Sequence, residues 1–262
     1  MDLFPVSLRD SQLFFLTFVR TGGLLVFAPL LGHRNLPATF KVGVAFFLAV
    51  VFYPLLKPFN FVAIRETAPL IVAVIQELAV GLLLGFTALL VFAGIQFAAE
   101  LISFQMGFTF ANVVDPQFSG QISVFTQFQD LLVLFFFLSL NGHHLFLRAL
   151  GESMQLVPPL GASFGPGLVG QLMASAGRLF AVGVQMAAPV VAAIVLANLV
   201  LGVLARTVPQ MNILMVGFSL TIPLGFLVIV LSVPLFLRQA ELLFVQMGQD
   251  LSVVVRSLAN AR

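Results

Sequence analysis

The sequence lacks cysteine altogether, and it contains no tryptophan and only one tyrosine, Tyr53. Without cysteine the chain forms no disulfide and offers no thiolate for metal binding, redox chemistry or nucleophilic catalysis. Tryptophan and tyrosine anchor many lipid-facing helices at the level of the headgroups. Their near absence therefore argues against a chain whose helices are all surrounded by lipid.

Charge is also scarce, because only 8% of the 262 residues are charged, whereas soluble domains average about 25%. Hydrophobic residues make up 60% of the chain, and the mean hydropathy is +1.13. This composition excludes an ordinary soluble domain and a disordered chain. The net charge of +2 comes with no run of adjacent basic residues, so we expect no nucleic-acid partner.

The sequence shows no pattern typical of catalysis. The metalloprotease, nucleophile-elbow and Walker A motifs are absent. Residues 165–170 spell a dinucleotide-binding glycine pattern, but Pro166 interrupts it and no strand-like run precedes it. His143 and His144 would point about 100° apart on a helix, so they do not suit a shared metal ion. We therefore expect no enzymatic activity, no metal and no cofactor.

Long uncharged runs predict an all-α membrane-protein subunit with about six long, kinked hydrophobic helices. A helix needs about 20 apolar residues to cross the hydrocarbon core. The third, fifth and sixth runs meet this length easily, while the others are short or contain a charge. The six runs are residues 12–31, 42–56, 78–99, 125–140, 179–205 and 207–237. Prolines and glycines within them predict kinks and close helix packing.

Two further uncharged stretches contain too many helix breakers to be simple spans. Residues 153–177 are rich in proline and glycine, and we expect a loop or a broken helix there. Residues 101–121 are interrupted by Gly107, Gly120 and an Asp-Pro pair. Non-helical backbone at membrane depth is tolerated only against protein or a water-filled cavity. This makes the second stretch the first functional candidate.

Methionine and phenylalanine are concentrated in this second stretch, and such side chains can close a narrow pore by packing and dewetting. The alternative is a buried re-entrant loop with no passage beside it. The candidate pore or plug residues are Met106, Gly107, Phe108, Phe110, Asp115 and Pro116.

Three charged residues, Arg20, Glu77 and Glu100, lie in or beside apolar runs. Such residues usually face a protein interior, a partner or water rather than lipid. A proton relay is one interpretation, but we favour structural ion pairs or interface anchors, with Arg20 and Glu77 as the first pair to test. Gly81 and Gly85 form a G-x-x-x-G face, for which we favour packing within the chain over a subunit contact.

The distribution of basic residues predicts an orientation. With six crossings, eight basic residues, including Arg148 and Arg256, fall on the side of both termini and three on the opposite side. The positive-inside rule then places both termini in the cytoplasm.

Four segments together resemble a known family: residues 28–37, 107–116, 141–144 and, most specifically, 206–212, which read Arg-Thr-Val-Pro-Gln-Met-Asn. They resemble the FliR/SctT family of export-gate subunits in type III secretion, and in particular its flagellar members. The resemblance covers nearly the whole chain.

The resemblance implies a FliP-like N-terminal part, residues 1–171, and a FliQ-like helical hairpin with a C-terminal tail, residues 172–262. It also implies that a core loop, residues 106–121, projects into the lumen of the gate and helps to plug it. The hairpin tip would contact a neighbouring subunit or FlhB through Arg206, Pro209, Gln210 and Asn212.

The implied assembly contains one copy of this chain with several copies of FliP and FliQ, while FlhB wraps its cytoplasmic mouth and FlhA lies beside it. Such a gate would pass unfolded flagellar proteins across the bacterial inner membrane at the flagellar basal body. Three alternatives stay open from the residues alone: a multi-pass secondary transporter of a small solute, an intramembrane enzyme, and a scaffold whose loop gates nothing.

Overall fold

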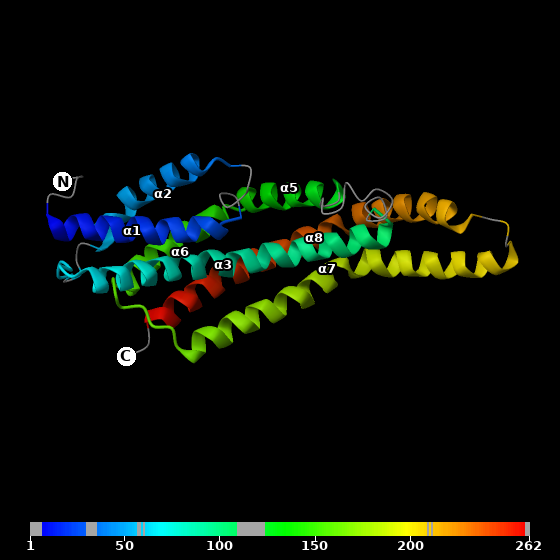
Figure 1. Cartoon of the computed structure of the whole chain (residues 1–262). Coiled ribbons are helices and arrows are strands. Elements are labelled where there is room, and N and C mark those ends of the chain that lie inside the picture. Colours follow the sequence, from blue (N-terminus) through cyan, green and yellow to red (C-terminus); the bar gives the residue numbers. More distant parts are fainter. Residues whose placement is uncertain are drawn as a thin grey trace. The chain divides into compact units, whose positions relative to one another are not determined.

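The chain folds into helices. The computed structural model describes residues 7–29, 36–56, 59, 61–108, 124–208, 210 and 212–259, and within these residues it contains no strand. The elements, drawn in Figure 1, are α1 (Leu8–Phe27), α2 (Ala38–Phe52), the 3-10 helix η1 (Tyr53–Leu56), α3 (Thr67–Met106), α5 (Val124–Ser139), α6 (His143–Leu156), α7 (Pro166–Thr207) and α8 (Ile213–Ala259). The all-α membrane-protein fold is confirmed.

Fewer helices are long and apolar enough to span a membrane than the six runs predict. The described residues contain four such segments: Ala38–Leu56, Thr67–Met106, Pro166–Thr207 and Met215–Ala259. A fifth arises if α5 and α6, which bend by 63° at a short break, count as one span. Helix α1 covers most of the remaining run but carries Arg9, Asp10 and Arg20, so its composition does not suit a lipid-exposed span.

The stretch 153–177 is less broken than its prolines and glycines predict. Only residues 157–165 lie outside helices, and α7 begins at Pro166. Proline is well tolerated at the first position of a helix, because its missing N–H would have no partner there. Gly167, Gly170 and Gly177 lie inside α7 with nothing within 4 Å of an added Cβ, and each costs only about 1 kcal/mol of helix propensity relative to alanine.

The last helix is shifted from its predicted range of 207–237. Helix α8 begins at Ile213, where the Asn212 side chain accepts a hydrogen bond from the Met215 N–H at 3.3 Å and so caps the helix. It continues beyond Leu237 to Ala259. Charged residues such as Arg238 and Glu241 stop an apolar run but are good helix formers, which is why the helix does not end there.

The chain divides into two compact units that interleave along the sequence. One comprises Met1–Val91, Phe137–Ala176 and Phe244–Arg262, and the other comprises Phe92–Phe136 and Gly177–Leu243. Helices α3, α5, α7 and α8 each contribute to both units. The division at residues 171 and 172 concerns similarity to other subunits, and it stays a prediction.

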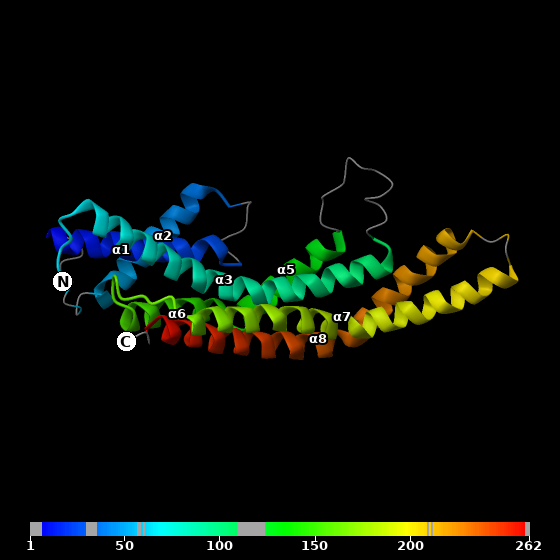
Figure 2. The same ribbon diagram turned by 60° about the horizontal axis from the view of Figure 1, so that its bottom comes forward.

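Helices α1 and α3 pack backbone to backbone in the first unit, where the two lie side by side in Figures 1 and 2. A Cβ atom on Gly23 would lie 2.8 Å from the Leu78 carbonyl oxygen, and one on Gly85 would lie 2.6 Å from the Leu24 carbonyl oxygen. Gly81 faces the backbone of α1 in the same way. Packing of the G-x-x-x-G face within the chain is therefore confirmed.

We expect Gly23→Ala to destabilise the protein and its neighbour Gly22→Ala to leave it unchanged or slightly more stable. Alanine gains up to about 1 kcal/mol over glycine in a helix, and a Cβ on Gly22 meets nothing within 4 Å. At Gly23 the methyl group would clash with the backbone of α3, and overpacking costs about 1–3 kcal/mol. Apparent melting temperatures in mild detergent measure the difference, and equal values for the two variants would contradict the packing.

In the second unit the end of α3 packs against α7. The rings of Phe97 and Phe180 meet edge to face with their centroids 5.5 Å apart. A Cβ on Gly94 would lie 3.3 Å from the Leu179 carbonyl oxygen, and one on Gly183 would touch the Phe97 ring. Aromatic rings against glycines thus fix the position of the helix end from which the core loop starts.

Candidate functional site

The start of the core loop is held on α8. Met106, the last residue of α3, is fully buried, and its carbonyl oxygen accepts a hydrogen bond from the Thr221 hydroxyl at 3.2 Å. Gly225 lies one turn further along α8, where a Cβ would come within 2.7 Å of the Met106 sulfur. Only glycine at this position leaves room for the methionine side chain.

Gly107 ends α3 in a conformation that favours glycine. Its φ of +92° lies in the left-handed region. The Gly107 N–H donates to the Phe104 carbonyl at 3.1 Å, and the Phe108 N–H donates to the Ser103 carbonyl at 3.1 Å. These two bonds form the Schellman motif that terminates many helices. The Phe218 ring of α8 occupies the space that a Cβ on Gly107 would need.

Phe108 completes the attachment, because its ring meets Phe226 edge to face with the centroids 6.1 Å apart. The other residues of α8 that hold the loop start follow Phe218 by three, seven and eight positions, which places them on one side of the helix. We call the whole group the loop anchor. It consists of Met106, Gly107 and Phe108 with Phe218, Thr221, Gly225 and Phe226.

The structure therefore brings three of the six candidate plug residues onto α8. The other three, Phe110, Asp115 and Pro116, lie outside the described residues. Sequence reasoning missed the α8 half of the anchor. The glycine that ends α3 is visible in the sequence, but nothing in the sequence marks α8 as its partner.

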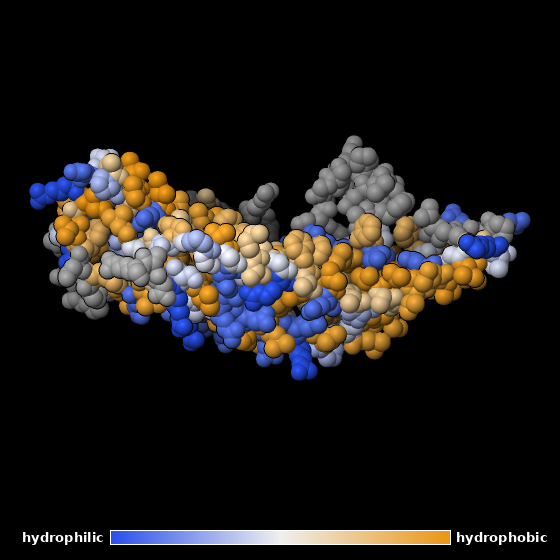
Figure 3. All heavy atoms as spheres, turned by 90° about the horizontal axis from the view of Figure 1, so that it is seen from below, coloured by the Kyte–Doolittle hydropathy of each residue, from blue (hydrophilic) through white to orange (hydrophobic). Residues whose placement is uncertain are grey.

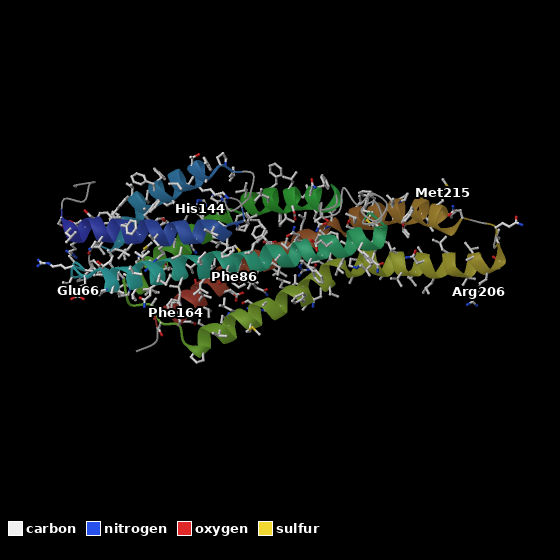
Figure 4. All side chains as sticks on the ribbon, in the orientation of Figure 1. Glu66, Phe86, His144, Phe164, Arg206 and Met215 are labelled. Carbon is white, nitrogen blue, oxygen red and sulfur yellow. The ribbon has the colours of Figure 1, made fainter. Side chains whose placement is uncertain are left out.

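The α7–α8 hairpin ends in a polar tip. Arg206 lies in the last turn of α7, where a positive charge is favoured by the helix dipole, and it has no ion-pair partner among the described residues. Gln210 and Asn212 are exposed beyond it, and Pro209 lies outside the described residues. Figure 4 shows Arg206 and Met215 on the two arms at this end of the hairpin.

The arms of the hairpin expose a large apolar surface. In the most apolar stretch of each helix, only 22% of the residues of α7 and 11% of those of α8 are buried inside the chain. Figure 3 shows hydrophobic atoms over most of the hairpin on the face in view, with hydrophilic atoms near its tip. The most exposed residues include Leu196, Leu199, Val200, Val203, Leu227, Val230 and Leu231. Such a surface requires lipid or protein to cover it.

The structure also brings Arg20 and Glu77 together in the first unit. The Arg20 Nε–H donates to Glu77 Oε2 at 2.5 Å, and Nη2 donates to Oε1 at 2.9 Å, in a buried bidentate pair. Nη1 donates to the Ser153 carbonyl at 2.7 Å and its hydroxyl at 3.4 Å, and Nη2 donates to the Val157 carbonyl at 3.0 Å. All five N–H groups of the guanidinium are thus satisfied.

This buried network joins α1, α3 and the end of α6. The Ser153 carbonyl lies in the last turn of α6 and accepts a hydrogen bond from the N–H of the C-cap residue Val157 at 3.0 Å, so the guanidinium is its second donor. The guanidinium also donates to the Val157 carbonyl, which lies past the last helical turn. The arrangement is that of a structural clamp, because all the donors of the guanidinium are engaged with α3 and the end of α6.

Comparison with known proteins places the chain in a family. Residues 11–247 match the family of bacterial export proteins, family 1. The flagellar biosynthetic protein FliR of Bacillus subtilis is 36% identical, over 99% of this chain and 95% of that protein. FliR of Escherichia coli K12 is 31% identical over 94% of each chain, and FliR of Aquifex aeolicus is 31% identical over 84% of each. The chain therefore belongs to the FliR family of bacterial export proteins, as a helical membrane component of flagellar export.

Proposed function

We propose that this chain is a non-enzymatic channel subunit of the flagellar export gate. It assembles in one copy with FliP and FliQ in the bacterial inner membrane, with FlhB around the cytoplasmic mouth and FlhA beside it. The assembly gives unfolded flagellar proteins a passage across the membrane. The observation that carries the proposal is the apolar surface of the α7–α8 hairpin.

That surface favours protein partners over lipid alone. A helix surrounded by lipid is commonly anchored by tryptophan or tyrosine at both interfaces, and the chain has no tryptophan and a single tyrosine outside the hairpin. Pro189, Pro223 and Pro234 lie inside the two arms, and kinked helices suit packing against other helices. The exposed hairpin is thus an assembly surface.

The same proposal assigns residues 172–262 to a FliQ-like hairpin and residues 1–171 to a FliP-like part. Helices α7 and α8 are the two longest of the chain, at 42 and 47 residues, and they follow one another across a short tip. Two long antiparallel helices of this kind stack readily beside similar hairpins. Arg206, Pro209, Gln210 and Asn212 at the tip contact a neighbouring subunit or FlhB.

The core loop that starts at Met106 plugs the closed gate. A plug must be held firmly at its base. The loop anchor supplies the firm base, because a hydrogen bond, a buried methionine and an aromatic pair fix the loop start on α8. Phe108 and Phe110 supply bulky apolar side chains that dewet a narrow passage.

Purification of the tagged chain in mild detergent, followed by mass determination, tests the proposal. We expect a large complex that contains two kinds of small hydrophobic partner. Because the chain has no cysteine, Gln210→Cys introduces a unique thiol at the tip, and we expect it to cross-link to a partner that carries an engineered cysteine. A strain without FliQ is the control.

A stable monomer or homodimer that moves a small solute would instead support a secondary transporter. The tip cross-link is tried with cysteines in FliP, FliQ and FlhB. If a large complex forms but no cross-link appears, the export-gate proposal stands and the contact role of Gln210 is overturned.

A further inference from the structure

A groove lies between α6 and the C-terminal part of α8, within the first compact unit. The two helices run side by side there in Figure 2. Its volume is about 500 Å³, within the range of about 300–1,000 Å³ that small-molecule sites occupy. The lining residues are Leu145, Arg148, Ala149 and Glu152 of α6 with Val245, Gly248, Gln249, Ser252, Val253 and Arg256 of α8.

The floor of the groove is apolar and exists because of a glycine. Gly248 lacks a side chain where a Cβ would lie 3.2 Å from a methyl group of Leu145, so α8 approaches α6 closely at this point. Leu145 and Ala149 continue the floor along α6, and Val245 and Val253 flank it on α8. The floor thus offers a narrow hydrocarbon-lined track rather than a polar site.

Two exposed arginines lie at the rim of the groove. Arg148 on α6 and Arg256 on α8 are exposed, and neither has an ion-pair partner among the described residues. The one carboxylate in the lining, Glu152, accepts a hydrogen bond from the Ser252 hydroxyl at 3.1 Å. A ligand with a negative head and an apolar tail complements both parts of the groove.

We propose that this groove binds an anionic phospholipid. Its phosphate contacts Arg148 and Arg256, whose planar guanidinium groups suit phosphate oxygens. One acyl chain lies on the floor along Leu145, Gly248 and Val253. Basic pockets between membrane helices commonly take anionic headgroups.

An acidic peptide fits the groove less well, because its backbone polar groups would lose water on the apolar floor without gaining partners. Free phosphate would use the rim and leave the floor uncovered. A lipid is the ligand that complements both the basic rim and the apolar floor. The proposal rests on the membrane location of the chain and does not depend on the gate function.

Native mass spectrometry of the purified complex tests the site. The complex is exchanged into detergent with defined amounts of phosphatidylglycerol or phosphatidylcholine, and retained lipid is counted. Each arginine near an anionic surface contributes an affinity factor of about five. We expect Arg148→Gln with Arg256→Gln to lower phosphatidylglycerol retention about thirtyfold, and retention to fall with added salt.

The matched control is Arg65→Gln with Arg238→Gln, which removes the same charge from exposed positions outside the groove. This pair should retain phosphatidylglycerol like the unaltered chain. Equal losses in both double variants, or equal retention of phosphatidylcholine, would overturn the proposal. Two further measurements distinguish binding of the whole lipid from binding of its phosphate alone. Displacement of the lipid by millimolar inorganic phosphate, or equal binding of a six-carbon-chain phosphatidylglycerol, would overturn a role for the apolar floor.

Discussion

Replacing Arg20 by methionine is expected to leave little folded protein in the membrane. The guanidinium is fully buried and makes five hydrogen bonds, two of them to the buried carboxylate of Glu77. Methionine fills a similar volume but leaves that carboxylate without a counter-charge. Removal of one partner from a buried pair costs about 3–5 kcal/mol, a large share of the roughly 5–15 kcal/mol that stabilises a domain.

A conservative variant separates charge from geometry. Arg20→Lys keeps the positive charge, but one ammonium group has three donors and no planar fork. It cannot reach Glu77 and both the Ser153 and Val157 carbonyls together, so we expect Arg20→Lys to fall well short of full stability. If lysine restores full stability, the carbonyl contacts to α6 contribute nothing and only the charge matters.

The double variant Arg20→Met with Glu77→Met gives the decisive comparison. It removes both charges, so we expect it to be more stable than either single variant, although the Val157 carbonyl loses its donor and the Ser153 carbonyl loses one of two donors. Protein yield and apparent melting temperature in mild detergent measure the series. Arg65→Met, which replaces an exposed arginine, should stay within about 0.5 kcal/mol of the unaltered chain. A double variant no better than Arg20→Met would contradict the pair.

The Arg20 network shows what the sequence could and could not predict. Arg20 inside one apolar run and Glu77 at the start of another are visible at once, and a membrane-buried charge needs a partner, so Arg20 with Glu77 followed from the sequence. The other two partners are backbone carbonyls at the end of α6, more than a hundred residues away from Arg20. Every residue has a carbonyl, and no side-chain type marks these two.

The ends of the helices also show which features can be predicted from neighbouring residues and which depend on distant ones. Uncharged runs located α3, α7 and the first half of α8, because apolar length is a local property. The start of α7 at Pro166 and the extension of α8 to Ala259 were missed, because the runs were delimited by charge and by helix breakers. The loop anchor joins Met106 to Thr221 across 115 positions, and its residues become neighbours only in the fold.

Replacing Gly107 by alanine is expected to make the closed gate leak small ions. This prediction rests on the proposed plug role of the core loop. The φ of +92° costs a non-glycine residue about 1–2 kcal/mol, and the new methyl group would meet the Phe218 ring at 2.5 Å. The strain alone shifts the balance between anchored and displaced loop about 5- to 30-fold. Ion flux into cells or vesicles that hold intact complexes measures the change.

The matched control is Gly217→Ala, whose added methyl group would make only ordinary contact, 4.0 Å from Leu201. This variant should assemble, and its gate should stay closed to small ions. Phe108→Ala removes the aromatic contact with Phe226 without backbone strain, so we expect it to leak as well, and more so when Phe110→Ala is added. If all three loop variants assemble normally and none raises ion flux above the control, residues 106–121 do not close the gate. If only Gly107→Ala leaks, the anchor matters through backbone strain, and the phenylalanines are not the seal.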